Sequence, residues 1–111
     1  MKNSSDVVKE YPLSGDGVVR VYKPFGNEKY IAVVEQHGRY PEAGKTARNH
    51  GRSEFSVIIS GTFEYCVDGV QTTLKEKDHI LVGDGQRYSI EGNGKALVFV
   101  TDREGGATLI E

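Results

Sequence analysis

The chain has little of what several classes of protein need. It carries one cysteine, Cys66, so it cannot form an internal disulfide and is compatible with a reducing compartment. It has no apolar run of about 20 residues, the length that a membrane-spanning helix requires. Its first residues lack the apolar core of a signal peptide. We therefore expect a cytoplasmic protein with no membrane partner.

An excess of charge of one sign is missing as well. The chain has 16 acidic and 14 basic residues, which give a formal net charge of -2 and a pI near 5.9. Proteins that bind nucleic acid usually carry a clear basic excess. The charge balance therefore argues against a nucleic-acid partner.

No stretch shows sustained helical periodicity, whereas glycine is abundant, with 14 glycines against 3 prolines. Short β-branched segments alternate with turn signals, of which Asp68-Gly69 is the clearest, because a type I′ turn needs positive φ at both central residues. This pattern predicts an all-β sandwich or barrel in a single domain. The expected strands are 18–22, 30–35, 56–60, 62–67, 70–74, 80–82, 88–91, 95–101 and 107–110, with a loop at 39–49.

Two segments resemble the conserved motifs of the cupins. Residues 44–61 read GKTARNHGRSEFSVIISG, which is similar to the first motif, and residues 77–88 are similar to the second. The resemblance covers most of the domain. It implies a double-stranded β-helix, or jelly roll, with a ligand pocket inside the barrel. The expected organisation is a flexible or edge N-terminal arm at 1–15 followed by a cupin β-barrel at 16–111.

The metal site of cupins usually combines two histidines and a glutamate from the first motif with a histidine from the second. In this chain His50 and Glu54 stand at two of those positions, while Arg48 and Tyr88 occupy the others. A transition metal needs three or four N, O or S ligands, and the permanent charge of Arg48 repels a cation. The resemblance therefore leaves a divalent metal on His50 and Glu54 as one option and a site without a cofactor as the preferred one.

The same four residues suit a polar or anionic small-molecule ligand. Arg48 can pair with Glu54, or it can bind a carboxylate or phosphate of the ligand in a forked contact. His50 is then free to act as a general base, with Tyr88 as the second proton-transfer group. Metal-free cupins that isomerise or epimerise sugar nucleotides use such a pair. The resemblance thus implies an isomerase, epimerase or lyase acting on a polar, anionic or sugar-like compound.

Two alternatives stay open from the residues alone. In the first, the chain is a non-catalytic ligand-sensing or structural cupin, in which His50 bonds a neighbouring strand and Arg48 with Glu54 is a structural pair. In the second, it is a divalent-metal cupin enzyme that uses His50 and Glu54.

An apolar outer face predicts a homodimer. Phe55, Val57 and Ile59 alternate with Glu54, so they face outward if Glu54 faces the pocket. Such a face on a small barrel needs a cover, and a second copy of the chain is the usual one. The alternative cover is the N-terminal part of the chain itself.

Overall fold

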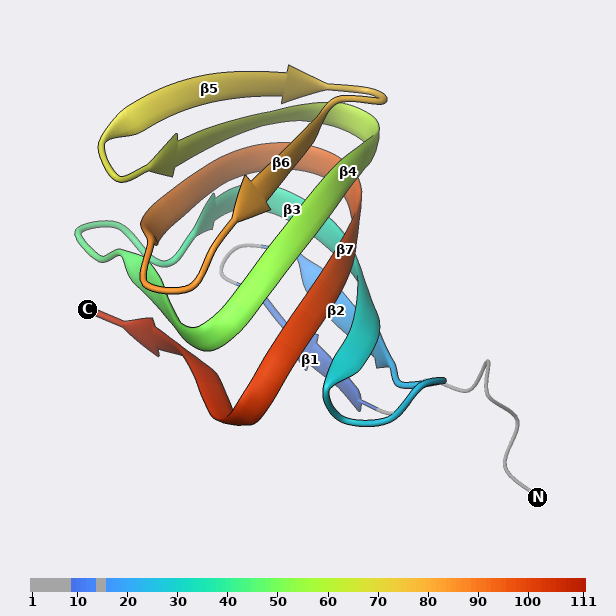
Figure 1. Ribbon diagram of the computed structural model, residues 1–111. Helices are drawn as coiled ribbons and strands as arrows, with labels where there is room; N and C mark the ends of the chain where they lie inside the picture. Colours follow the sequence, from blue (N-terminus) through green and yellow to red (C-terminus); the bar gives the residue numbers. More distant parts are fainter. Residues whose placement is uncertain (1–8, 14–15) are drawn as a thin grey trace.

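The computed structural model describes residues 9–13 and 16–111, in which seven β-strands form one sheet (Figure 1). This confirms the expected all-β class. In those residues no helix is long and apolar enough to span a bilayer. The strands are β1 (Lys9–Pro12), β2 (Val18–Tyr22), β3 (Lys29–Tyr40), β4 (Ala47–Val67), β5 (Val70–Lys75), β6 (His79–Val82) and β7 (Arg87–Ile110).

Two long strands, β4 and β7, organise the barrel. The strand order is β1-β2-β3-β7-β4-β5, with β6 paired to β4. Strands β4 and β7 lie side by side from Arg52 opposite Asp102 to Val67 opposite Tyr88, and Figure 1 shows both of them bending across the molecule. The sequence predicts several short strands here, which the structure joins into two.

The expected loop at 39–49 is shorter than the sequence suggests. Only residues 41–46 lie outside strands, because Arg39 and Tyr40 belong to β3 and the segment from Ala47 onward belongs to β4. Arg39 and Tyr40 pair with residues of β7. These long-range backbone hydrogen bonds override the polar composition of the segment. The Asp68-Gly69 turn is as predicted, with φ of 48° and 82°.

The N-terminal arm is only partly described. Lys9–Pro12 forms an edge strand that pairs with β2. The remainder of the expected arm, residues 1–8 and 14–15, lies outside the described residues.

The interior of the barrel is lined by apolar side chains that alternate along each strand. In β2, for example, Val19 and Val21 are both 5% exposed, while the residues between and beside them are half-buried. Both motif segments contribute to this wall. The other buried apolar residues are Ala32, Ala47, Ile58, Phe63, Tyr65, Leu74, Val82, Tyr88, Ala96, Val98 and Val100.

The bend in β4 depends on a close approach of two backbones at Gly61. A Cβ atom at Gly61 would lie 1.9 Å from the carbonyl oxygen of Asn93, and φ there is +82°. Gly61→Ala is therefore expected to lower the free energy of unfolding by more than about 3 kcal/mol, from backbone strain and steric overlap together.

Gly69→Ala is the matched control, measured by urea denaturation beside Gly61→Ala. Gly69 has the same φ of +82° but nothing within 4 Å of the added Cβ. Gly69→Ala should lower the free energy of unfolding by only about 1 kcal/mol, the cost of placing alanine in a left-handed backbone conformation. Equal losses for the two variants would show that the close approach at Gly61 is not needed for stability.

Candidate functional site

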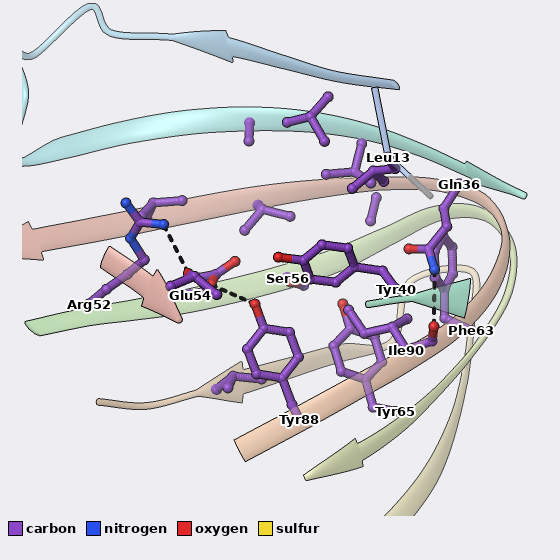
Figure 2. A pocket seen from close by; sticks show the side chains of 18 of the residues that line it. Leu13, Gln36, Tyr40, Arg52, Glu54, Ser56, Phe63, Tyr65, Tyr88 and Ile90 are labelled. Atoms are coloured by element: carbon purple, nitrogen blue, oxygen red, sulfur yellow. Dashed lines mark hydrogen bonds between the residues drawn. The ribbon is translucent and has the colours of Figure 1, made fainter. Parts of the chain in front are cut away.

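The barrel encloses a cavity of about 310 Å³ (Figure 2). This volume lies at the lower end of the range for small-molecule sites. Charged side chains gather at one end of it, tyrosines line the middle and an amide lies at the other end. The polar residues of the wall are Tyr11, Tyr30, Gln36, Tyr40, Arg52, Glu54, Ser56, Tyr65, Tyr88 and Thr108.

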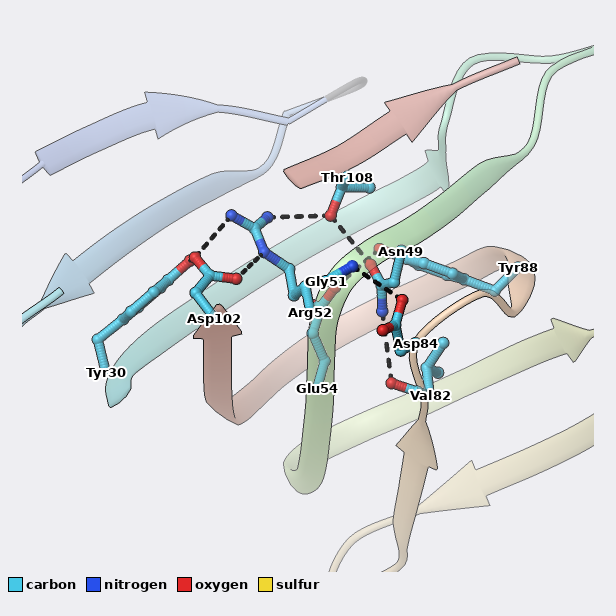
Figure 3. Close-up of polar contacts among 10 residues, drawn as sticks. All are labelled: Tyr30, Asn49, Gly51, Arg52, Glu54, Val82, Asp84, Tyr88, Asp102 and Thr108. Carbon is cyan, nitrogen blue, oxygen red and sulfur yellow. Dashed lines mark hydrogen bonds and ion pairs between the residues drawn. The ribbon is translucent and has the colours of Figure 1, made fainter. Parts of the chain in front are cut away.

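An ion pair between Arg52 and Asp102 fixes the charged end (Figure 3). Arg52 Nε donates to Asp102 Oδ1 at 2.5 Å and Nη2 donates to Oδ2 at 3.0 Å, which is a forked contact. Tyr30 donates to Asp102 Oδ2 at 2.9 Å, and Arg52 Nη1 donates to Thr108 Oγ1 at 3.0 Å. The two charged side chains are only 22% and 14% exposed. The guanidinium is therefore held rigidly at the cavity wall.

Glu54 lies beside this pair and is the only carboxylate among the described lining residues. The Tyr88 hydroxyl donates to Glu54 Oε1 at 3.1 Å. Burial raises the pKa of Glu54 above its ordinary value of 4.5, although the charge of Arg52 and hydrogen bonds from Tyr88 and Asn49 act in the opposite direction. A carboxyl group that faces a cavity with a raised pKa is suited to accept and return a proton.

Three tyrosine hydroxyls line the middle of the cavity. Burial raises the pKa of Tyr40 and of Tyr65 to about 12, and that of Tyr88 well above 10. The rings of Tyr40 and Tyr88 lie 6.3 Å apart between centroids. At neutral pH these phenols stay protonated. Tyr88 gives its hydrogen to Glu54, so Tyr40 and Tyr65 are the phenols that can donate to a ligand.

Gln36 forms the end of the cavity away from the charged residues. Its side chain is 1% exposed, and Nε2 donates to the carbonyl oxygens of Gly38 at 2.9 Å and Ile90 at 3.2 Å. Phe63 packs next to it because Gly92 has no side chain: a Cβ at Gly92 would lie 2.4 Å from the Phe63 ring. The amide is thus fixed in one orientation.

The structure brings together only two of the four predicted site residues, Glu54 and Tyr88. Arg48 pairs with Glu111, with Nε to Oε1 at 3.0 Å and Nη2 to Oε2 at 3.3 Å. Arg48 therefore neither pairs with Glu54 nor lines the cavity, where the sequence suggested one or the other role for it. His50 is exposed and does not line the cavity, so its expected position inside the pocket is also wrong.

A backbone irregularity at Gly51 explains the difference. On a regular strand His50 and Glu54 share a face, because side chains alternate with a period of two residues. Gly51 has φ of 66°, and the alternation shifts by one residue there. Asn49 is fully buried before it, whereas Arg52 and Glu54 line the cavity after it.

The turn between β6 and β7 holds this irregularity in place. Asp84 Oδ1 accepts a hydrogen bond from the Gly51 backbone N at 2.8 Å (Figure 3). The backbone of Asn49 bonds the same turn twice, accepting from Gly85 N at 2.8 Å and donating to the Gln86 carbonyl oxygen at 3.3 Å. The second motif therefore sets the geometry of the first.

The motif positions of the sequence do not place Arg52, Asp102, Gln36 or Tyr40 in the site, although Arg52 belongs to a basic cluster around the first motif that favours an anionic ligand. A signal existed for two of them. Arg52 stands two residues before Glu54 and so shares its face, and Gln36 continues the inward series of Ala32 and Val34. Nothing in the sequence marks Asp102 as the partner of Arg52.

The residues present do not fit the metal ion that the resemblance implies. His50 is exposed while Glu54 faces the cavity, so the two cannot share an ion. Within the described part of the chain, no three His, Cys, Asp or Glu side chains lie close enough to hold a metal. Glu54 interacts with the Arg52 guanidinium, the Tyr88 phenol and the Asn49 amide, and the raised pKa of Tyr88 disfavours a metal-binding phenolate.

The raised pKa of Glu54 predicts a pH dependence of stability. The folded state holds the proton of Glu54 more tightly than the unfolded state does, so this group favours folding at low pH. That contribution is complete below 4.5, the unfolded value, and is lost as the pH rises through the folded pKa. Wild type should therefore lose stability relative to Glu54→Gln as the pH rises from acid to neutral.

Urea denaturation of both proteins across that range measures the difference in their free energies of unfolding. The contributions of the other carboxylates are the same in both proteins, so they cancel in this difference. A difference that stays constant with pH, or that changes in the opposite direction, would contradict the raised pKa.

Solved structures with the same fold include cupins and a nucleoside dehydratase. A nucleoside dehydratase from Streptomyces matches with a TM-score of 0.79 and 15% identity over 98% of this chain and 92% of that one, and variants of it have been solved with uridine. An RmlC-like cupin from Shewanella frigidimarina matches with a TM-score of 0.66 and 16% identity over 91% and 87%. A cupin sugar phosphate isomerase from Silicibacter pomeroyi matches with 0.62 and 13% over 84% and 67%.

Sequence comparison gives a different relative. The chain is 30% identical over 97 residues to the co-chaperonin GroES of Methanosarcina mazei, across 82% of this chain and 98% of that one. No protein-family model matches the chain. The chain therefore belongs to the sequence family of that protein, and it shares its fold with the cupins.

Proposed function

We propose that the chain is a small-molecule cupin that transfers a proton to and from a carbon atom of its ligand, with Glu54 as the general base. The observation that carries this is a carboxyl of raised pKa that faces an interior cavity and is bonded to Tyr88. In this assignment Glu54 takes the role that the sequence suggests for His50, and Tyr88 keeps its role as the second polar partner.

The chemistry follows from the groups on the wall. A carboxylate base can remove a C–H proton only where a neighbouring carbonyl stabilises the resulting enolate. The electron pair of that C–H bond moves to the carbonyl oxygen, which accepts a hydrogen bond from a neutral tyrosine hydroxyl. Where the next carbon carries a hydroxyl, its C–O bond breaks and the hydroxide leaves as water with the proton from Glu54. Return of the proton to carbon instead gives an isomer or epimer.

The structural neighbours support a nucleoside-like or sugar-like substrate for this chemistry. The Streptomyces neighbour is a nucleoside dehydratase, and the Silicibacter neighbour is a sugar phosphate isomerase. Both reactions fall in the lyase and isomerase classes that the cupin resemblance implies. We therefore propose a substrate that joins a polar sugar-like part to a carbonyl group.

Deuterium exchange tests the proposed function whether the product is an isomer, an epimer or an elimination product, because it follows the proton that Glu54 moves. The purified protein is incubated in D₂O with sugars and nucleosides that carry a carbonyl on a sugar carbon, and mass spectrometry follows deuterium uptake and loss of water. We expect either deuterium uptake at the carbon next to the carbonyl or a product that has lost water, with a matching decrease of the starting compound. Binding without either change would instead identify a non-catalytic ligand-binding cupin.

The sequence relative favours a second candidate function, that of a co-chaperonin. The observation is 30% identity across 98% of the Methanosarcina protein. A chaperonin partner would act on the outer surface of the chain, so this function does not need the interior cavity. Co-elution of the chain with a purified archaeal chaperonin in the presence of ATP, unaffected by Glu54→Gln, is the result expected of it.

We also propose that two copies pair through the outer face of β4, β6 and β7. Phe55 lies opposite Leu81 on one side and Phe99 on the other, and these side chains are 38%, 60% and 43% exposed. Ile59, 50% exposed, extends the outward apolar series along β4. An isologous pair places this row of apolar side chains against its own copy. Analytical ultracentrifugation of wild type and Phe55→Lys distinguishes a dimer from a monomer.

A further inference from the structure

Gln36 leaves one chemical group for a ligand, its side-chain oxygen. Both hydrogens of Nε2 are used, on the carbonyl oxygens of Gly38 and Ile90. Because both neighbours are acceptors, the nitrogen must face them and the oxygen must face the other way. Figure 2 shows that oxygen turned into the cavity. Among the described residues, the structure gives it no hydrogen-bond donor.

An acceptor in this position selects its ligand strongly. The side chain is 1% exposed, so the oxygen has little access to bulk water. A ligand that fills the cavity without offering an N–H or O–H group leaves this acceptor buried and unpaired, which costs about 1–3 kcal/mol. The end of the cavity at Gln36 therefore favours ligands that place a hydrogen-bond donor there over ligands that do not.

The surroundings of Gln36 decide which kind of donor fits. Phe63, Tyr65 and Ile90 lie around this end, and Tyr40 lies between it and Glu54. Aromatic and aliphatic surfaces suit a flat ring better than a hydroxyl-rich sugar. The hydroxyls of Tyr40 and Tyr65 stay protonated, so they can donate to carbonyl oxygens of such a ring. The other end of the cavity holds Arg52 and Glu54, which suit a polar sugar.

We infer that Gln36 is a specificity-determining residue that accepts a hydrogen bond from the imide N–H of a pyrimidine-type ring. The substrate class is then a uracil-type nucleoside, with its ring at Gln36 and its sugar carbon at Glu54. This inference rests on the proposed function, and it adds the part of the substrate that does not react.

Calorimetric binding of three probes to the unmodified protein tests it. Uridine carries the imide N–H, 3-methyluridine carries a methyl group in its place, and ribose lacks the ring. Uridine is expected to bind at least about tenfold more tightly than either of the others, because only uridine pairs with the Gln36 oxygen. Equal affinities for uridine and 3-methyluridine, tighter binding of ribose, or no binding of uridine would each overturn the assignment.

Gln36→Met, which keeps the length of the side chain but removes the acceptor, identifies the residue responsible. It should weaken uridine binding by about tenfold and reduce the preference over 3-methyluridine to less than about threefold. His37→Ala is the control, since His37 is the next residue of β3 and its side chain is 43% exposed. A preference that survives in Gln36→Met would assign the discrimination to another group.

These experiments can refute the role of Gln36 and the proposed catalytic function independently of each other. If the protein discriminates uridine from 3-methyluridine but exchanges no deuterium with any carbonyl compound, the ring site stands and the catalytic function falls. If it exchanges deuterium without that discrimination, the catalytic function stands and the role of Gln36 falls.

Discussion

Glu54→Gln is expected to reduce turnover by roughly a thousandfold, the usual contribution of a general base, while ligand binding changes little. Glutamine has the size and hydrogen-bonding oxygen of glutamate, so it can still accept from the Tyr88 hydroxyl, which lies 3.1 Å from Glu54 Oε1. It cannot take a proton from carbon. The measurement is the rate of deuterium uptake next to the carbonyl, with ligand affinity followed by calorimetry on the same preparations.

His50→Ala is the matched control for that experiment. His50 is four residues earlier on β4, is exposed and does not line the cavity. It should keep turnover within about twofold of wild type, because a surface side chain that touches no ligand contributes little to the barrier. The reverse result, with activity lost in His50→Ala and kept in Glu54→Gln, would return the catalytic role to the residue that the sequence motif suggests.

Arg52→Met is expected to destabilise the fold by about 3 kcal/mol. The variant removes the guanidinium and leaves the Asp102 carboxylate, only 14% exposed, without its partner. The Tyr30 hydrogen bond to Asp102 at 2.9 Å remains but carries no positive charge. An uncompensated charge in a partly buried position is costly because little water reaches it. Urea denaturation at neutral pH measures the loss.

Two comparisons separate this effect from a general loss of an arginine. Arg52→Met combined with Asp102→Leu should recover part of the stability, since no charge then remains unpaired. Arg48→Met should have little effect, because its pair with Glu111 lies at the surface, where solvent screens the charges. If Arg48→Met lost as much stability as Arg52→Met, the partly buried position of Arg52 in the cavity wall would not be the cause of the destabilisation.

The fold could be predicted because its signals are local. Glycine-rich turns, the Asp68-Gly69 pair and the lack of helical periodicity each depend on a few neighbouring residues, and together they define an all-β chain. The order and spacing of the two motif segments then indicated the cupin barrel. What the local signals missed was continuity. Strands β4 and β7 pass through Gly61 and Gly94 without ending, since their pairing with each other carries the backbone across those glycines.

The site could be predicted only in part, because one residue changes the face of a strand. Glu54 and Tyr88 were found by motif position, and both lie on the cavity wall. Arg48 and His50 were placed inside by motif position too, and they share the face of Glu54 only if the side chains alternate regularly along the strand. The positive φ of Gly51 shifts this alternation by one residue. Whether a glycine in the sequence adopts such a conformation depends on distant partners, here a turn more than thirty residues later.

The ion pair at the charged end was hidden for a related reason. Arg52 and Asp102 meet because β4 and β7 place them opposite each other, and that register is a property of the whole barrel. The ends of the cavity likewise come from different strands, with Gln36 on β3 and Glu54 on β4. A single sequence carries the chemistry of these side chains but not their distances.

A ¹³C NMR titration of the Glu54 carboxyl is the most direct test of its role as a cavity base. Protein labelled at the glutamate side-chain carboxyl is titrated with acid in the presence and absence of uridine, and Glu54→Gln assigns the resonance. We expect a pKa above the ordinary 4.5 and a change in that resonance when uridine binds. A pKa at or below 4.5, together with no response to bound uridine, would show that Glu54 is neither perturbed nor in contact with the ligand.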